Sequence, residues 1–220
     1  MSGYRAVLFD AFGTLIELDR PAARLQAAVR MRLGREISHR QAAEAMRAEL
    51  MHYGGNCYRA RDQAALLNLR RECAAIVLDQ LGLDAGDATG LAVLSDAIAF
   101  RAYPDATQAL RRVGELGLAT AVVSNGDCSL PCALQSSGIE VDVVVDSATG
   151  GAAKPDPAIF ELALRRLGVE AAAALHVGDV PELDGEGARA AGIDVVIVDR
   201  SPVPAAGTIS SLLELEPMLA

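Results

Sequence analysis

Five short segments of this chain are rich in β-branched and other apolar residues, and polar or glycine-containing segments separate them. They cover residues 6–9, 118–123, 141–145, 175–177 and 195–198. Continuous apolar runs of this length are typical of strands that are buried on both faces of a parallel sheet. The pattern therefore predicts a parallel sheet with one strand near the N-terminus and four in the second half of the chain.

Segments with helical periodicity alternate with the later strands. They cover residues 105–116, 129–137, 157–167 and 182–191, and a glycine follows each of them, at Gly117, Gly138, Gly168 and Gly192. Glycine is common where a helix ends, because it adopts the left-handed conformation without strain. Strands that alternate with helices of this length predict an α/β fold, a doubly wound parallel sheet with a Rossmann-like core.

The segment between residues 19 and 99 has a different pattern. It lacks strand-like runs and carries long helical patterns at residues 38–51, 61–81 and 89–100. The segment leaves the predicted sheet after the first strand and returns before the second, and ligands bind at the carboxyl ends of such strands. We therefore expect an α/β core domain at residues 1–16 plus 102–220, and a helical cap domain at residues 17–101.

Composition and charge limit the classes of partner. With 220 residues, 51% of them apolar, the chain can bury a large core, and its net charge of −9 would repel a nucleic acid backbone. No apolar run approaches the ~18 residues that a membrane span requires. The four cysteines are too scattered for a disulfide framework. We expect a soluble cytoplasmic protein, monomer or homodimer, that binds neither nucleic acid nor membrane.

Polar residues gather directly after the predicted strands. Asp10 and Thr14 follow the first strand, Ser124 and Asn125 the second, and Asp179 the fourth. Asp184 comes five residues after Asp179, and Lys154 lies in the loop after the third strand. The carboxyl ends of parallel strands share one edge of a sheet, so these side chains are expected to converge.

Three carboxylates and one lysine at the same edge predict a site for a cation and an anionic ligand. Asp10 and Asp179 are hard oxygen ligands of the kind that Mg²⁺ prefers. With a cation present, Asp10 can act as a nucleophile that forms an aspartyl-phosphate. Lys154 and the hydroxyls of Thr14 and Ser124 would then position the phosphate oxygens, and Gly13 would let backbone amides approach closely.

Four ordered motifs carry a resemblance to a known family. They are residues 10–15 (DAFGTL), 124–126 (SNG), 154–157 (KPDP) and 176–179 (HVGD) with Asp184. Their order and spacing resemble the haloacid dehalogenase-like (HAD) hydrolase superfamily over nearly the whole core, and residues 17–101 resemble that family's helical cap. The resemblance implies a hydrolase, and the favoured function is a Mg²⁺-dependent phosphatase of a small phosphorylated metabolite.

Site roles follow from the resemblance residue by residue. Asp10 would be the nucleophile, and Thr14, Ser124, Asn125 and Lys154 would complete the catalytic set. Gly13 and Gly126, with Arg40 from the cap, would contact the small anionic substrate. The Mg²⁺ ligands would be Asp10, the backbone carbonyl of Phe12, Asp179 and Asp184.

One position departs from the phosphatase pattern. Phosphatases of this family usually carry a second aspartate two residues after the nucleophile, and this chain has Phe12 there. Loss of a general acid and base typically costs ~10²–10⁴ in rate. Either the leaving group needs little protonation, as in aryl or acyl phosphates, or another group such as Asp127, His39 or His52 supplies the proton.

Two other functions stay open. In a 2-haloacid dehalogenase, whose relatives carry an aromatic residue at the Phe12 position, Asp10 would form an ester without a metal and Arg40 would assist halide departure or hold the substrate carboxylate. A catalytically weak phosphometabolite-binding module would also explain Phe12. The phosphatase is favoured because Asp179 with Asp184 resembles the metal-binding form of the fourth motif.

Overall fold

The computed structural model describes residues 3–219, and the chain divides into two compact units. The core unit comprises Met1–Glu17 and Arg101–Ala220, and the helical unit comprises Leu18–Phe100. In the described part of the chain no helix is long and apolar enough to cross a membrane. All four cysteines are free thiols.

The core unit contains a sheet of five parallel strands, as predicted. Their order across the sheet is β5 (Val143–Asp146), β4 (Ala119–Ser124), β1 (Ala6–Phe9), β6 (Ala174–Gly178) and β7 (Asp194–Ile197). Each strand lies within two residues of its predicted position. The doubly wound α/β fold class is therefore confirmed.

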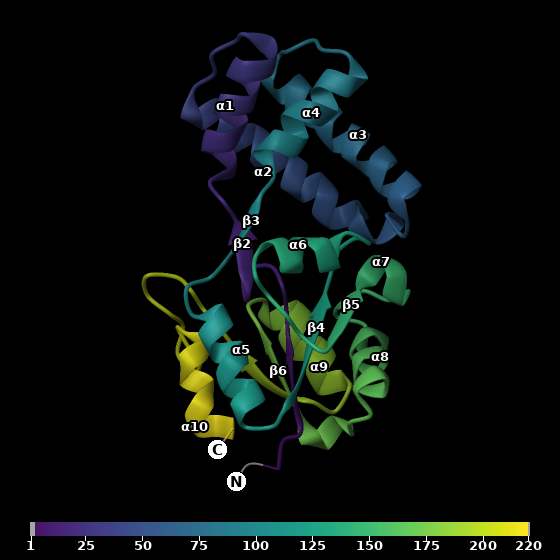
Figure 1. Ribbon diagram of the computed structural model, residues 1–220, viewed down its shortest axis with the longest axis vertical. Coiled ribbons are helices and arrows are strands. Elements are labelled where there is room, and N and C mark those ends of the chain that lie inside the picture. Colours follow the sequence, from purple (N-terminus) through teal and green to yellow (C-terminus); the bar gives the residue numbers. More distant parts are fainter. Residues whose placement is uncertain (1–2, 220) are drawn as a thin grey trace. The chain divides into compact units, whose positions relative to one another are not determined.

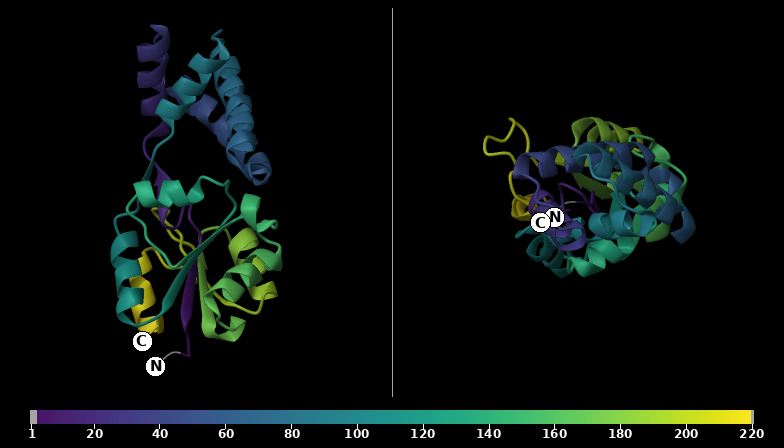
Figure 2. Two further views of the ribbon diagram at one scale, coloured as in Figure 1. Left: turned by 45° about the vertical axis from the view of Figure 1, so that its right-hand side comes forward. Right: turned by 90° about the horizontal axis from the view of Figure 1, so that it is seen from above.

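Helices cover both faces of this sheet (Figures 1 and 2). Helices α5 (Ala106–Glu115) and α10 (Glu216–Leu219) lie on one face, and α8 (Pro157–Leu167) and α9 (Glu186–Ala190) on the other. Leu8, Ala121 and Val123 are fully buried in one apolar cluster with Ile159 and Phe160 of α8. Burial of both faces explains why the strands appear in the sequence as continuous apolar runs.

The central position of β1 brings the strand ends together. Phe9, its last residue, is in register with Val122 of β4 and with Val177 of β6. Asp10 therefore leaves the sheet at the same level as Ser124, the last residue of β4, and Gly178, the last residue of β6.

Helix ends explain which helices the sequence predicted well. Helix α8 has Pro157 in its first turn, an N-terminal cap from the side chain of Asp156, and Gly168 in the left-handed conformation at its end. The prediction of a single helix over residues 182–191 is wrong, because Pro181–Gly185 forms a wider π-helical turn before α9. Asp184 lies within this turn, and its side chain accepts a hydrogen bond from the Val180 amide.

The helical unit consists of α1 (Pro21–Leu33), α2 (His39–Asn56), α3 (Gln63–Leu81) and α4 (Asp87–Ala97). Helices α1 and α3 each pack against both α2 and α4. The sequence analysis missed α1, whose preceding residue Arg20 supplies no side-chain cap. By contrast, Ser38 and Gln41 form a capping box that marks the start of α2.

Two short strands, β2 (Ile16–Leu18) and β3 (Phe100–Ala102), pair with each other where the two units meet along the chain. Neither was predicted, and the predicted helix over residues 89–100 ends at Ala97, because Ile98 adopts an extended conformation. Three-residue strands are too short to show an alternating pattern.

Gly187 of α9 provides a test of the packing between α8, α9 and the Lys154 loop. A Cβ at this position would approach the Phe160 ring at 2.7 Å and the Pro155 carbonyl oxygen at 2.8 Å. We expect Gly187→Ala to lower the free energy of unfolding by about 2 kcal/mol or more, since overpacking forces backbone shifts. Urea unfolding monitored by circular dichroism measures this change.

The matched control is Gly114→Ala in α5, where a Cβ would meet nothing within 4 Å. This substitution should leave stability unchanged or raise it by up to ~1 kcal/mol, because alanine favours a helix over glycine. Equal stability changes in the two variants would contradict the packing described here.

Candidate active site

The loop after β1 is a tight turn that begins with Asp10. The Asp10 amide donates to the Val177 carbonyl at 2.8 Å, which continues the β1–β6 ladder by one residue. The amides of Leu15 and Ile16 both donate to the Ala11 carbonyl at 2.9 Å. Gly13 adopts a φ of 86°, and a Cβ there would overlap the carboxylate of Asp179. Glycine is therefore required at this position both for the backbone and for the approach of Asp179.

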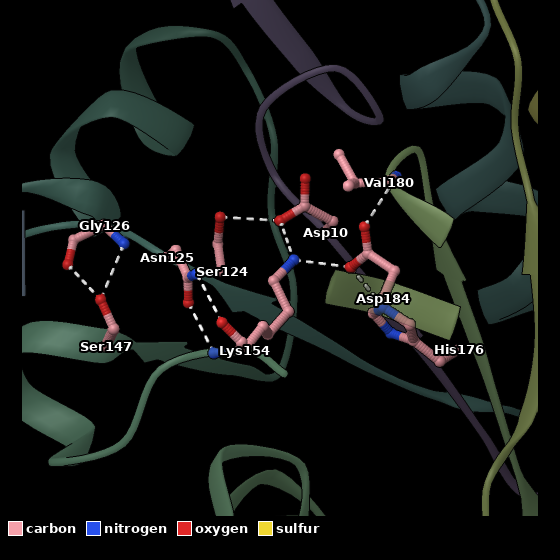
Figure 3. Close-up of polar contacts among 9 residues, drawn as sticks. All are labelled: Asp10, Ser124, Asn125, Gly126, Ser147, Lys154, His176, Val180 and Asp184. Carbon is pink, nitrogen blue, oxygen red and sulfur yellow. Dashed lines mark hydrogen bonds and ion pairs between the residues drawn. The ribbon is translucent and has the colours of Figure 1, made fainter. Parts of the chain in front are cut away.

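Lys154 lies between two carboxylates at this edge of the sheet (Figure 3). Its Nζ donates to Asp10 Oδ1 at 2.6 Å and to Asp184 Oδ1 at 2.6 Å. The hydroxyl of Ser124 donates to the same Asp10 oxygen at 2.8 Å. All four side chains are buried. Burial alone would lower the pKa of Lys154, but the charges and hydrogen bonds of Asp10 and Asp184 outweigh it and raise this pKa, so the ammonium is charged.

His176 of β6 holds Asp184 from the opposite side. Its Nε2 lies 2.9 Å from Asp184 Oδ1, and the ring is fully buried, edge-on to Phe160. Burial lowers the pKa of His176, so the ring is neutral and donates from Nε2. Burial would raise the pKa of Asp184, but the bonds from His176 and Lys154 hold it below its usual range. His176 therefore packs beside the site and orients a carboxylate.

Gly178 makes the position of Asp184 possible. A Cβ on Gly178 would overlap the Asp184 carboxylate, which lies directly against the last residue of β6. The other carboxylate oxygen of Asp184 accepts from the Val180 amide at 3.0 Å. Asp184 thus accepts three hydrogen bonds, and its side chain is fixed within the site rather than capping a helix.

Asn125 fixes the backbone of Lys154, and Ser147 fixes that of Gly126 (Figure 3). The Asn125 amide group pairs with the backbone of Lys154, accepting from its N–H at 2.8 Å and donating to its carbonyl at 3.0 Å. The Ser147 hydroxyl accepts from the Gly126 amide at 3.2 Å and donates to the Gly126 carbonyl at 3.1 Å. No sequence motif indicated Ser147, which lies at the start of a short helix, α7 (Ser147–Gly150).

Asp179 completes a cluster of three carboxylates. One oxygen each from Asp10, Asp179 and Asp184 lies within 4.8 Å of the other two. Burial, followed by the charges of Asp10 and Asp184, raises the pKa of Asp179 to about 7. Because Lys154 already bonds Asp10 and Asp184, the cluster holds more negative than positive charge. Such a set of hard oxygen donors fits a divalent cation such as Mg²⁺.

Thr14 contributes a hydroxyl to the same loop. The residue is fully buried, and within residues 3–219 its Oγ1 has no hydrogen-bond partner. Buried hydroxyls are normally bonded, so this unpaired hydroxyl, four residues after Asp10 in the chain, is suited to a polar ligand. A second oxygen of Asp10 accepts no bond from the residues drawn in Figure 3 and is available for chemistry.

The sequence analysis named Asp127, His39 and His52 as alternative proton donors and Arg40 as a substrate contact. Asp127 accepts hydrogen bonds from the amide and the hydroxyl of Ser129, as a turn or cap residue does. His52 bonds Glu72 in the helical unit at 3.0 Å. Arg40 lies on α2 of the helical unit, 84% exposed and 4.0 Å from Glu44. His39 begins the same helix.

Phe12 lies two residues after Asp10, at the position where the phosphatase pattern has a second aspartate. A Cβ on Gly126 would lie 3.7 Å from Cε2 of the Phe12 ring, so the ring packs beside the loop that carries Ser124 and Asn125. The phenyl ring fills this space without offering a proton.

Residues 4–192 match the family model of the haloacid dehalogenase-like hydrolases. The chain belongs to this family. The match includes all the core residues of the site, and the chain is a hydrolase.

Relatives in this family carry two kinds of name. Phosphatase MT3486 of Mycobacterium tuberculosis is 36% identical over 56% of this chain, and the match spans 59% of that protein's length. (S)-2-haloacid dehalogenase 4A of Burkholderia cepacia is 31% identical over 98% of this chain and 95% of its own. The solved L-2-haloacid dehalogenase PA0810 has the same fold, with a TM-score of 0.77 at 23% identity and 98% coverage of both chains.

The raised pKa of Asp179 predicts a pH-dependent loss of stability in the metal-free protein. The folded state binds the Asp179 proton more tightly than the unfolded state, in which the pKa is near 3.8, so stability falls as pH rises from about 4 to about 7. Asp179→Asn removes this contribution, so the variant should gain stability relative to wild type between these pH values. Urea midpoints at pH 5 and pH 8 with chelator measure the difference.

The control is Asp84→Asn at an exposed aspartate of the helical unit, which should follow the wild-type profile. A wild-type and an Asp179→Asn profile that run parallel from pH 5 to pH 8 would contradict the electrostatics of this cluster.

Proposed function

We propose that this hydrolase is a Mg²⁺-dependent phosphatase that acts on a small phosphorylated metabolite. The observation that carries the proposal is the charge imbalance of the site, where three clustered carboxylates face a single lysine. A buried surplus of negative charge is costly unless a cation compensates it. A dehalogenase needs no such cation.

Four groups would hold the metal ion, namely the carboxylates of Asp10, Asp179 and Asp184 and the backbone carbonyl of Phe12. When bound, Mg²⁺ would offset the charge of the cluster and allow an anionic phosphoryl group to approach Asp10. The similarity to phosphatase MT3486 supports this reading.

The protein's own side chains would perform the transfer. An oxygen of Asp10 attacks phosphorus, and the bond from phosphorus to the leaving oxygen breaks with its electron pair on that oxygen. A water oxygen then bonds to phosphorus, the bond from phosphorus to the Asp10 oxygen breaks, and inorganic phosphate and the free Asp10 carboxylate are released, with the water protons passing to phosphate and solvent. Lys154 and Ser124, which hold Asp10 Oδ1, keep the carboxylate oriented, and the unpaired hydroxyl of Thr14 would donate to a phosphate oxygen.

The absence of an acid at Phe12 limits the substrates in this proposal. The leaving oxygen must depart without a proton from this position, which favours aryl and acyl phosphates over alkyl phosphates. The substrate class is therefore a phosphorylated metabolite with a leaving group of low basicity. Gly13, Gly126 and, from the helical unit, Arg40 are the proposed substrate-contacting residues.

Hydrolysis of an aryl phosphate tests the proposal. We expect turnover with Mg²⁺, loss of turnover with chelator, and a fall of at least ~10³-fold in kcat for Asp10→Asn, because the nucleophile is removed. Asp84→Asn should retain wild-type kcat, since its side chain is exposed in the helical unit.

A dehalogenase is the second candidate, favoured by Phe12 and by the similarity to (S)-2-haloacid dehalogenase 4A over nearly all of both chains. The test is halide release from a 2-haloacid in the presence of chelator. If halide is released and the aryl phosphate is not hydrolysed, the protein is a dehalogenase and not a phosphatase. Binding of phosphate without either reaction would indicate a binding module.

Exchange of Phe12 tests the proposed leaving-group limit. Phe12→Asp introduces a proton donor and acceptor, so we expect the ratio of alkyl to aryl phosphate turnover to rise by about 10- to 100-fold, within the range of general acid catalysis. Phe12→Asn is the matched control, since it removes the same ring but has no ionisable proton for acid or base catalysis. Steady-state kinetics on both esters measure the ratio, and an equal ratio in the two variants would refute the limit.

A further inference from the structure

Arg200 follows β7 in the core unit and contacts the Asp10 loop from outside the four motifs. Its Nη2 donates to the Thr14 carbonyl at 2.6 Å, and its Nε donates to the Gly13 carbonyl at 3.2 Å. The side chain is 17% exposed. One guanidinium therefore holds two consecutive carbonyls of the loop.

The other edge of the same guanidinium is anchored on Asp105. Nη1 and Nη2 donate to the two Asp105 oxygens, each at 3.1 Å. Asp105 also accepts from the Ser211 hydroxyl at 2.9 Å and from the Leu212 amide at 2.8 Å. Burial would raise the pKa of Asp105, but these hydrogen bonds, first that of Arg200, lower it, so the carboxylate stays ionised.

Tyr103 supports the guanidinium from one side. The Arg200 Cζ lies 3.8 Å from the centre of the Tyr103 ring, and the Tyr103 amide donates to the Leu15 carbonyl at 3.0 Å. Arg200, Asp105 and Tyr103 thus form a clamp around residues 13–15. We call these three residues the loop clamp.

Because peptide groups are planar, the two hydrogen bonds from Arg200 to carbonyl oxygens also set the direction of the adjoining N–H groups. The carbonyl of Gly13 and the amide of Thr14 belong to one planar group, so fixing the oxygen fixes the direction of the N–H. The same holds for the Thr14 carbonyl and the Leu15 amide, which donates to Ala11. The bonds from Arg200 therefore set the orientation of the segment that carries the unpaired Thr14 hydroxyl and follows Asp10.

We propose that Arg200 is a positioning residue for this site, which acts by holding the peptide groups of Gly13 and Thr14 in the orientation that catalysis requires. The inference rests on the proposed function for its kinetic consequence, but its structural part concerns the loop alone. Lysine at this position keeps the charge but cannot serve two carbonyls and a carboxylate at once, because it lacks the planar fork.

The test compares Arg200→Lys with wild type in two measurements. Small misplacement of reacting groups costs up to ~10²-fold in rate, so kcat on the aryl phosphate should fall about 10- to 100-fold while KM changes less than about threefold. Amide hydrogen exchange of the ligand-free protein should accelerate at Gly13, Leu15 and Ile16, with β4 unchanged.

Three further variants complete the test. Asp105→Asn should produce the same pattern, and the double variant should be no worse than either single one, because both act through the clamp. Arg165→Lys is the control, an exposed arginine that pairs with Glu161 on α8, and it should resemble wild type in both measurements.

Three results would overturn the inference: unchanged loop exchange in Arg200→Lys, wild-type kcat in the folded variant, or acceleration of exchange throughout the core unit, which would indicate a general structural role. An inactive wild-type enzyme would refute the phosphatase instead. Loop exchange alone would then decide for or against the clamp.

Discussion

The contact of Lys154 with Asp10 and Asp184 is the interaction on which the rest of the site depends. Three buried charges can share this space because the Lys154 ammonium donates at 2.6 Å to one oxygen of each of the two carboxylates. Removal of the ammonium would leave two carboxylates without compensation beside a third, Asp179. The lysine therefore stabilises the arrangement of the strand ends, apart from its role in the proposed reaction.

Neighbouring residues hold the contact of Lys154 with Asp10 and Asp184 in place at the edge of the sheet. The Asn125 side chain bonds both the N–H and the carbonyl of Lys154. The loop after β4 therefore fixes the backbone from which the lysine side chain extends. His176 also bonds Asp184 Oδ1, and the Val180 amide donates to Asp184 Oδ2. Gly13 and Gly178 are glycines because a side chain at either position would occupy the space of a carboxylate. Chemistry and packing therefore constrain the same residues.

Much of the fold could be predicted from the sequence, because its signals are local. The apolar runs of the five strands and the glycine after α8 reflect burial and helix termination within a few residues. Helix α1 and the strands β2 and β3 carry no such signal, because Arg20 provides no cap and three residues show no period.

The site shows the same division. The convergence of Asp10, Ser124, Lys154, Asp179 and Asp184 could be expected, since parallel strands end at one edge. Their bonding could not, because it depends on turns such as the π-helical one at Pro181–Gly185 and on side chains far away in sequence. The roles of Ser147 and Arg200 are therefore visible only in three dimensions.

The central place of β1 also has a consequence for biosynthesis. The strand that leads to Asp10 is made first, yet its two neighbours, β4 and β6, come from the second half of the chain. Until they emerge from the ribosome, an apolar strand has both edges open and no sheet to join, a state in which chains aggregate. Because Asp184 and Arg200 follow later still, Lys154 gains its bond to Asp184, and the Asp10 loop its bonds from Arg200, only after β6 has been synthesised.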